Sequence, residues 1–198
     1  MLSRNVQLLE DLGHKVYFST ADLVSILNIK PASAKVLATR YTRKGIFIRL
    51  KRDLYVLTQS WQNYTTEEFL KIANLIQVPS YISFMTALNY YEVTTQVQRN
   101  FFESAAQRRT ISYDIRGTVF TYYKLKRQYY FDFSRKEDIF ISTKEKAFTD
   151  AVYLYSFGKY KMDFDSLDLA KLDMQKIEKL IQIYPEKTIK IMRKLCKI

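Results

Sequence analysis

Cysteine, histidine and glycine are scarce in this sequence of 198 residues, and each shortage excludes a class of function. The single cysteine, Cys196, cannot form an internal disulfide framework. With His14 as the only histidine, the common zinc sites lack the ligands they need. Four scattered glycines leave no glycine-rich loop to hold a phosphate. We therefore expect no metal, no cofactor and no catalytic residue, so the chain is not expected to be an enzyme.

Long apolar runs are also missing. The longest uncharged run, residues 72–91, contains two asparagines, a glutamine and a proline, which makes it too polar for a membrane span. Residues 1–15 carry two acidic side chains where a signal peptide needs an apolar core. A hydrophobic content of 47% with few glycines and prolines is typical of an ordered globular chain. We expect a cytoplasmic protein with no membrane partner, and a reducing compartment suits its lone cysteine.

What the sequence has in excess is positive charge. Lysine and arginine number 32 against 20 aspartates and glutamates, so the net charge is +12 and the isoelectric point is about 9.6. Eight of the cations and none of the acids lie between residues 23 and 52, a stretch that we call the cationic segment. An ordinary solvated surface mixes the two signs, so this clustering indicates nucleic acid or another anionic surface as the partner.

The order of elements around the cationic segment is that of a winged helix-turn-helix. Apolar spacing and capping residues predict three helices, and alternation predicts two strands joined by a tight turn. Thr20 or Ser19 can cap the second helix, Pro31 suits the first position of the third, and Gly45 suits its end. The expected ranges are 2–12, 21–28 and 31–44 for the helices, 46–51 and 54–58 for the strands, and 16–19 for a short extended piece. We assign residues 1–60 to this domain.

The third helix and the hairpin carry the residues expected to contact DNA. Four residues recur at helical spacing and are expected inside: Ala34, Leu37, Ala38 and Tyr41. The outward side then presents small, hydroxylated and basic side chains to a major groove, where lysine and arginine reach guanine edges. In the hairpin, Phe47, Arg49 and Lys51 alternate onto one face that is placed for phosphates or the minor groove. The predicted contacts with double-stranded DNA are Lys30, Ser33, Lys35, Thr39, Arg40, Arg43, Lys44, Arg49, Lys51 and Arg52.

Residues 65–198 are predicted to form a second domain of helices and strands. Helical spacing predicts helices near 66–77, 83–91 and 143–157, followed by two tail helices, and alternation predicts strands between 96 and 141. The expected fold class is therefore α+β. A winged helix is followed by a mixed α/β domain whose mainly antiparallel sheet is flanked by helices.

Three segments carry a resemblance to a known family. Residues 18–57 contain the predicted helix-turn-helix and hairpin, and they are followed by "VPSYISFMTALNYYEV" (78–93) and "ISTKEKAFTDAVYL" (141–154). In this order the three segments resemble the AbiEi family of antitoxins and transcriptional autoregulators, which belong to type IV toxin–antitoxin systems of abortive phage infection. Two positions depart from the family pattern, because Asp53 and Glu92 stand where the family usually has glycine.

The resemblance implies a function for each domain. The winged helix would bind inverted repeats upstream of its own operon and repress it. The C-terminal domain would act as antitoxin against a nucleotidyltransferase-like toxin encoded by the neighbouring gene, without forming a tight complex with it. Lys146 and Asp150 match a lysine and an aspartate of the family, which makes them candidates for antitoxin action. A packing or ion-pair role for the two residues is equally open.

Two other functions stay open at this point. The run "DIFISTKEKAFTD" (138–150) is the best site for a metal-dependent nuclease, but it lacks the Glu-x-Lys spacing of such enzymes. On one helix Glu145 and Asp150 would also lie about 140° apart, so their carboxylates would not converge. The other alternative is a plain winged-helix regulator whose C-terminal domain senses a ligand or a partner. Neither His14 nor Cys196 is expected to be catalytic.

Overall fold

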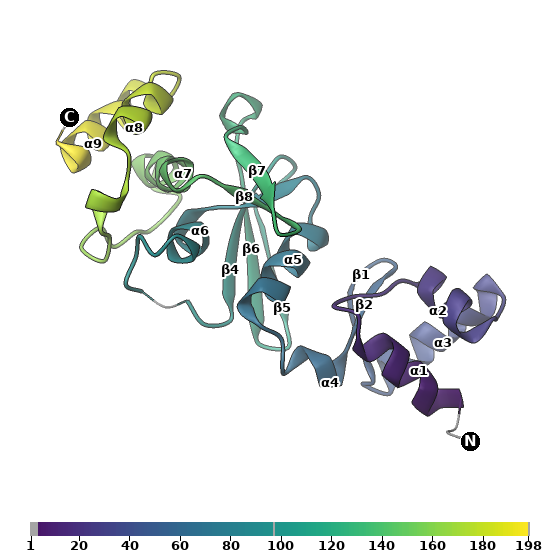
Figure 1. Cartoon of the computed structure of the whole chain (residues 1–198). Helices are drawn as coiled ribbons and strands as arrows, with labels where there is room; N and C mark the ends of the chain where they lie inside the picture. The colour runs from purple at the N-terminus through teal and green to yellow at the C-terminus, as the bar shows by residue number, and fades with distance from the viewer. Residues whose placement is uncertain (1–3, 97, 198) are drawn as a thin grey trace. The chain divides into compact units, whose positions relative to one another are not determined.

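The computed structural model describes residues 4–96 and 98–197, and the chain divides into two compact units (Figure 1). The first unit ends at Ile72 and the second begins at Ala73, so the division falls inside helix α5 (Thr66–Ile76). The boundary predicted from the sequence lies a few residues earlier, between 60 and 65. Both units combine helices with strands, so the protein belongs to the mixed α and β class. Nowhere in the described ranges is a helix long and apolar enough to cross a membrane.

The described part of the N-terminal unit begins with helices α1, α2 and α3 and a hairpin, which lie close to the ranges that the sequence predicts, and the short helix α4 follows them. Its strands β1 and β2 pair antiparallel, and Phe18 adds a bridge to Tyr55 through two backbone hydrogen bonds of 2.9 and 2.8 Å. The extended piece predicted before the second helix therefore pairs with β2 through this one antiparallel bridge. The elements are α1 (Arg4–Gly13), α2 (Thr20–Leu27), α3 (Pro31–Arg43), β1 (Phe47–Lys51), β2 (Leu54–Leu57) and α4 (Thr58–Trp61).

Local capping explains where α2 and α3 begin and end. Ser19 is the N-cap of α2: its hydroxyl accepts a bond from the Asp22 amide, and the Asp22 carboxylate accepts one from the Ser19 amide. Pro31 takes the first position of α3, where no backbone donor is needed. Gly45 follows α3 at φ 72°, a left-handed conformation that costs glycine little. These short-range signals determine the ends of the helices around the cationic segment.

Aromatic rings form the centre of the core of this unit. Phe47 lies edge-on to Phe18, with 4.8 Å between ring centroids, and edge-on to Tyr41 at 5.1 Å. Phe18 also stacks on Tyr55 at 6.0 Å. Edge-to-face and offset ring pairs add to the stabilisation that burial of each ring supplies. The cluster therefore joins α3 to the hairpin and to the bridge at residue 18.

The described part of the C-terminal unit holds a six-stranded mixed sheet with the order β5-β6-β4-β3-β8-β7 (Figure 1). The pairs β5–β6, β4–β3 and β8–β7 are antiparallel, whereas β6–β4 and β3–β8 are parallel. The predicted sheet was mainly antiparallel, and three of the five pairings have that sense. The strands are β3 (Ser80–Ile82), β4 (Phe101–Ala106), β5 (Ile111–Ile115), β6 (Thr118–Lys124), β7 (Phe133–Lys136) and β8 (Ile139–Ser142).

Helices pack on this sheet through α6 and α7. Helix α6 contacts β4 and α7, and α7 contacts the two tail helices. Every residue of α7 except its first and Tyr155 is buried, so this helix is surrounded by the rest of the unit. The helices and 3-10 turns of the unit are α6 (Phe84–Tyr90), α7 (Lys144–Ser156), α8 (Met174–Ile181), α9 (Glu186–Cys196), η1 (Arg127–Tyr129) and η2 (Leu169–Lys171).

Two features of the sheet differ from the sequence-based expectation. Strand β3 has only three residues, too few for an alternation pattern to show, yet it lies between β4 and β8. Within the span 96–141, where alternation predicts strands, the segment 129–133 would be one of them, but Tyr129 lies in a 3-10 turn and β7 begins only at Phe133. Tyr129 stacks on Tyr184 at 4.5 Å and lies edge-on to Tyr153 at 4.7 Å. This tertiary packing outweighs the β propensity of the tyrosine.

Candidate nucleic-acid interface and buried carboxylates

The predicted contact residues on α3 are all exposed. Lys35, Thr39 and Arg43 are spaced four residues apart, so they form one stripe along the helix. Val36 beside them is 68% exposed, so its methyl groups lie in solvent. On the opposite side Ala34, Ala38 and Tyr41 are buried and Leu37 is half-buried, as the helical spacing predicts. Helix α3 therefore presents a basic, partly apolar stripe to the surroundings.

Two side chains on α3 already make local contacts that restrict what they can offer a ligand. The Thr39 hydroxyl donates to the Lys35 carbonyl at 2.9 Å, so its oxygen is left to accept and its methyl to pack. The Arg40 guanidinium lies 5.5 Å from the Tyr41 ring centroid, a cation–π distance. Thr39 therefore suits a base donor or a methyl group, and Arg40 is held at the flank of the helix.

The hairpin exposes Arg49, Lys51 and Arg52 and buries its apolar residues. A bulge interrupts the pairing between Arg49 and Lys51, and the Arg49 Nε donates to the Lys51 carbonyl at 3.2 Å. The expectation that Phe47 shares an outward face with Arg49 and Lys51 is wrong, because Phe47 is only 1% exposed. The cause is the aromatic core, which covers the start of β1 and leaves only its end in solvent.

Asp53 is the one acidic residue in the sequence from 23 to 57, and it faces the start of α2. Its carboxylate accepts bonds from the Thr20 amide at 2.9 Å and from the Thr20 hydroxyl at 2.6 Å. These bonds, and then the charges of Lys35 and Arg52, hold the pKa of Asp53 below its ordinary value. Its φ of 58° is the left-handed conformation for which the resembled family uses glycine. Asp53 thus links the hairpin turn to the start of α2. Because the charge of Lys35 lowers the pKa of Asp53, this end of the stripe on α3 lies near the same turn.

Lys146 and Asp150, the candidates for antitoxin action, form a fully buried ion pair on α7. The Asp150 carboxylate also accepts hydrogen bonds of 2.9 Å from the hydroxyls of Tyr81 and Ser83. The Lys146 ammonium donates to the Tyr81 hydroxyl at 3.1 Å and lies 5.0 Å from the Phe131 ring centroid. The pair therefore ties α7 to β3 and to the residue that follows it.

Burial acts on the two charges of this pair in opposite directions. It raises the pKa of Asp150 and lowers the pKa of Lys146, and the attraction between the two groups opposes both shifts. A buried charge without its partner is strongly unfavourable. Of the roles left open by the sequence, the structure shows the ion pair, and a part in antitoxin action stays a prediction.

The acidic residues proposed for a nuclease face different partners. A Glu145 oxygen accepts from the Asp173 amide at 3.2 Å, and the Lys176 ammonium lies 3.5 Å from the other. Asp150 faces Tyr81 and Lys146 instead. Within residues 4–96 and 98–197, no group of three or more His, Cys, Asp or Glu side chains is arranged to hold a metal ion.

The fold resembles that of a solved mycobacterial protein. The crystal structure of the Rv2827c protein from Mycobacterium tuberculosis superposes with a TM-score of 0.66 over 100% of this chain and 77% of that chain, at 9% sequence identity. At this identity the likeness concerns the fold alone. No protein-family model matches the sequence, and no curated protein matches it significantly.

Glu103 is a buried carboxylate in the middle of β4 and is not among the residues predicted from the sequence. One oxygen accepts from the Met85 amide at 3.1 Å and from the Tyr160 hydroxyl at 2.8 Å, and the other from the Tyr123 hydroxyl at 3.4 Å. Burial raises the pKa of Glu103 to about 7, against the pull of these bonds. The signal in the sequence is an acidic residue inside the apolar run "FFESAA" (101–106).

We expect the free energy of unfolding of Glu103→Gln to increase relative to that of wild type as the pH rises. The folded-state pKa of about 7 exceeds the unfolded value of about 4.5, so the carboxyl contributes stability below pH 4.5 that is lost between pH 4.5 and 7. The difference in unfolding free energy between variant and wild type should shift by about 3 kcal/mol in favour of glutamine over this window. Urea unfolding at pH 4.5, 6 and 8 measures it. A difference that does not change with pH would contradict a raised pKa.

Proposed function

We propose that the protein is a DNA-binding transcriptional autorepressor, with its N-terminal unit acting as a winged helix-turn-helix. The observation that carries the proposal is the exposed stripe of Lys35, Thr39 and Arg43 on α3, next to a hairpin turn with Arg49 and Arg52 in solvent. In this arrangement α3 enters the major groove and the hairpin lies against the phosphate backbone.

The chemistry of the stripe suits the edges of base pairs. Lysine and arginine donate to the two acceptors of guanine, and the bare Val36 side chain packs against a thymine methyl. Thr39 accepts from an adenine or cytosine amine, since its proton is already donated to Lys35. Sequence preference is therefore assigned to α3, and general affinity to Arg49, Lys51 and Arg52.

A merely solvated helix face is the competing interpretation of these cations. Helix α9 is an example of such a face: Glu186 pairs with Lys190 at 2.7 Å, one turn apart, and both are exposed. Helix α3 has no acidic residue with which its cations could pair in this way. Cations without acidic neighbours repel one another on an isolated helix. Their concentration on α3 is better explained by a polyanionic partner.

The test is binding to the DNA upstream of the protein's own gene, compared with scrambled DNA, by fluorescence anisotropy over a salt series. We expect a preference for the upstream DNA that persists as salt rises. If about six phosphates are neutralised per protomer, the slope of log K against log salt should be about −5. Equal and steeply salt-dependent binding to both DNAs would contradict an operator-specific repressor.

We assign the antitoxin activity to the C-terminal unit, on the resemblance of residues 78–93 and 141–154 to the AbiEi family. The functional partner is then a nucleotidyltransferase-like toxin encoded by the neighbouring gene. Co-expression of the two genes should rescue growth, whereas size-exclusion chromatography of the two proteins should show no stable complex. If growth arrest persisted when the two proteins were expressed at matched levels, the antitoxin activity would be contradicted and the proposed repressor function would be unaffected.

A further inference from the structure

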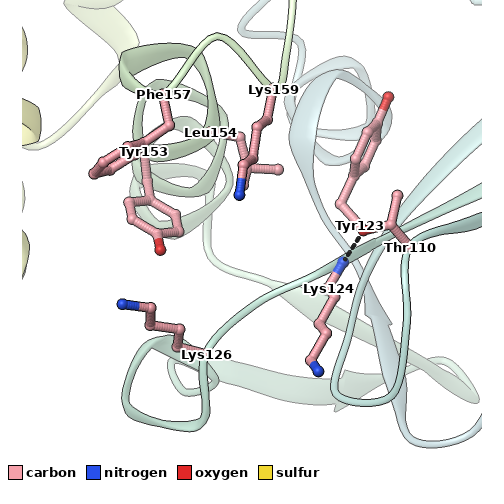
Figure 2. A pocket seen from close by; sticks show the side chains of 8 residues that line it. All are labelled: Thr110, Tyr123, Lys124, Lys126, Tyr153, Leu154, Phe157 and Lys159. Atoms are coloured by element: carbon pink, nitrogen blue, oxygen red, sulfur yellow. Dashed lines mark hydrogen bonds between the residues drawn. The ribbon is translucent and has the colours of Figure 1, made fainter.

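The C-terminal unit contains a cavity of about 570 Å³ that neither DNA binding nor the buried ion pair uses. Figure 2 shows it between the end of α7 on one side and the end of β6 with the connection after it on the other, and Lys159 reaches in from the α7 side. Its volume lies within the range of about 300–1,000 Å³ typical of small-molecule sites. The cavity is therefore large enough for a nucleotide-sized ligand.

Three lysines line this cavity, two from one stretch of chain and one from the opposite side. Lys124 ends β6, Lys126 lies in the connection after it, and Lys159 lies in the turn after α7. All three side chains are exposed, and the described residues that line the cavity include no acidic side chain. Three cations without a carboxylate between them favour an anion with several oxygens, such as a phosphate chain.

The same cavity offers an aromatic surface beside the cations. Phe157 ends α7 with 44% of its surface exposed, and its ring lies edge-on to Tyr153 at 5.5 Å. The Lys187 ammonium lies 5.6 Å from the Phe157 ring centroid and adds a fourth cation to the neighbourhood. An exposed ring held next to ammonium groups suits a planar base that carries phosphates.

We propose that this cavity binds a nucleoside phosphate. The base lies against Phe157, and the phosphates lie between Lys126 and Lys159. The Tyr153 hydroxyl faces the same space in Figure 2 and can hydrogen-bond to the ligand. The site belongs wholly to the C-terminal unit, so it does not depend on the proposed DNA interface.

Calorimetric titration of the full chain with ATP, GTP, CTP and UTP, and with inorganic tripolyphosphate, tests the proposal. We expect at least one nucleotide to bind more tightly than tripolyphosphate. The double variant Lys126→Gln/Lys159→Gln should weaken that binding at least tenfold. The matched control Lys161→Gln/Lys179→Gln removes the same charge from exposed lysines outside the cavity and should change it less than twofold.

The variant Phe157→Leu distinguishes the contribution of the base to binding from that of the phosphates. It should weaken nucleotide binding about tenfold, as expected for loss of a stacking ring, and leave tripolyphosphate binding unchanged. A melting temperature close to wild type without ligand shows that the variant folds.

Three results would overturn the proposal. The first is that no nucleotide binds more tightly than tripolyphosphate. The second is an equal loss in the Lys126/Lys159 variant and its control. The third is a loss in Lys35→Ala/Arg43→Ala with none in the cavity variant, which would place the nucleotide on the DNA-binding face instead. None of these outcomes bears on whether α3 recognises DNA.

Discussion

Lys146→Met is expected to lower the free energy of unfolding by about 3–5 kcal/mol, because it leaves the buried Asp150 carboxylate without its counter-charge. Methionine is unbranched like lysine and only one atom shorter, so a change in packing contributes less than the loss of the charge. Two hydroxyls still donate to Asp150, from Tyr81 and Ser83, but neither carries a charge. Urea unfolding followed by circular dichroism measures the loss.

The double variant Lys146→Met/Asp150→Asn should recover part of this stability. Asparagine removes the unpaired charge and keeps an oxygen that accepts from the hydroxyls of Tyr81 and Ser83. As a matched control, Lys161→Met places the same substitution at an exposed lysine of the same unit and should cost less than about 0.5 kcal/mol. If Lys146→Met were no more destabilising than Lys161→Met, the buried pair would not stabilise the fold.

This result also determines how the pair can take part in antitoxin action. Both side chains are 0% exposed, so a partner cannot contact them on the folded surface. We therefore expect Lys146→Met to lose growth rescue only to the extent that it loses folded protein, and the double variant to regain it. Loss of rescue by a double variant that is stably folded would instead show a direct role of the two residues.

The second large effect is expected at α3. Lys35→Ala/Arg43→Ala should abolish the preference for the upstream DNA. The two residues lie two turns apart on the exposed stripe, and each loses the donors that would bind a guanine edge. Removing a bidentate hydrogen-bonded pair with a base costs about 1–3 kcal/mol of discrimination. Anisotropy with upstream and scrambled DNA at one salt concentration measures the ratio of affinities. An unchanged ratio would show that α3 does not read the sequence.

The hairpin variant Arg49→Ala/Lys51→Ala/Arg52→Ala should behave differently. These side chains are placed for phosphates, so binding to both DNAs should weaken together, and the salt slope should fall by about 1 for each phosphate that is no longer neutralised. Lys161→Ala/Lys179→Ala/Lys194→Ala removes the same three positive charges from exposed positions of the other unit and is the control for net charge. Loss of preference in the hairpin variant with intact affinity would reverse the assigned roles of α3 and the hairpin.

The predictable features of this protein are those that neighbouring residues determine. Pro31 and Gly45 mark the ends of α3 through their backbone properties, and the spacing of Ala34, Ala38 and Tyr41 shows which side is buried. The exposure of the stripe on α3 follows directly from the same spacing.

The features that could not be predicted depend on residues far apart in the sequence. Asp53 lies in the tight turn that the sequence predicts, but its partner Thr20 is 33 residues away and no local pattern indicates it. Phe47 was expected outside because strand alternation does not show how far the aromatic core extends along β1. Glu103 and its partners come from different elements, so its raised pKa is a property of the packed unit.

The sequence by itself determined the helices and hairpin of the N-terminal unit and the concentration of positive charge on them, because caps, turns and amphipathic spacing are short-range effects. Only the tertiary structure decided the strand order around β3, the burial of Lys146 with Asp150, and the placing of Lys126 and Lys159 on two sides of one cavity. These features arise from contacts between segments that approach one another only when the sheet and α7 pack together. No local pattern encodes which segments those are.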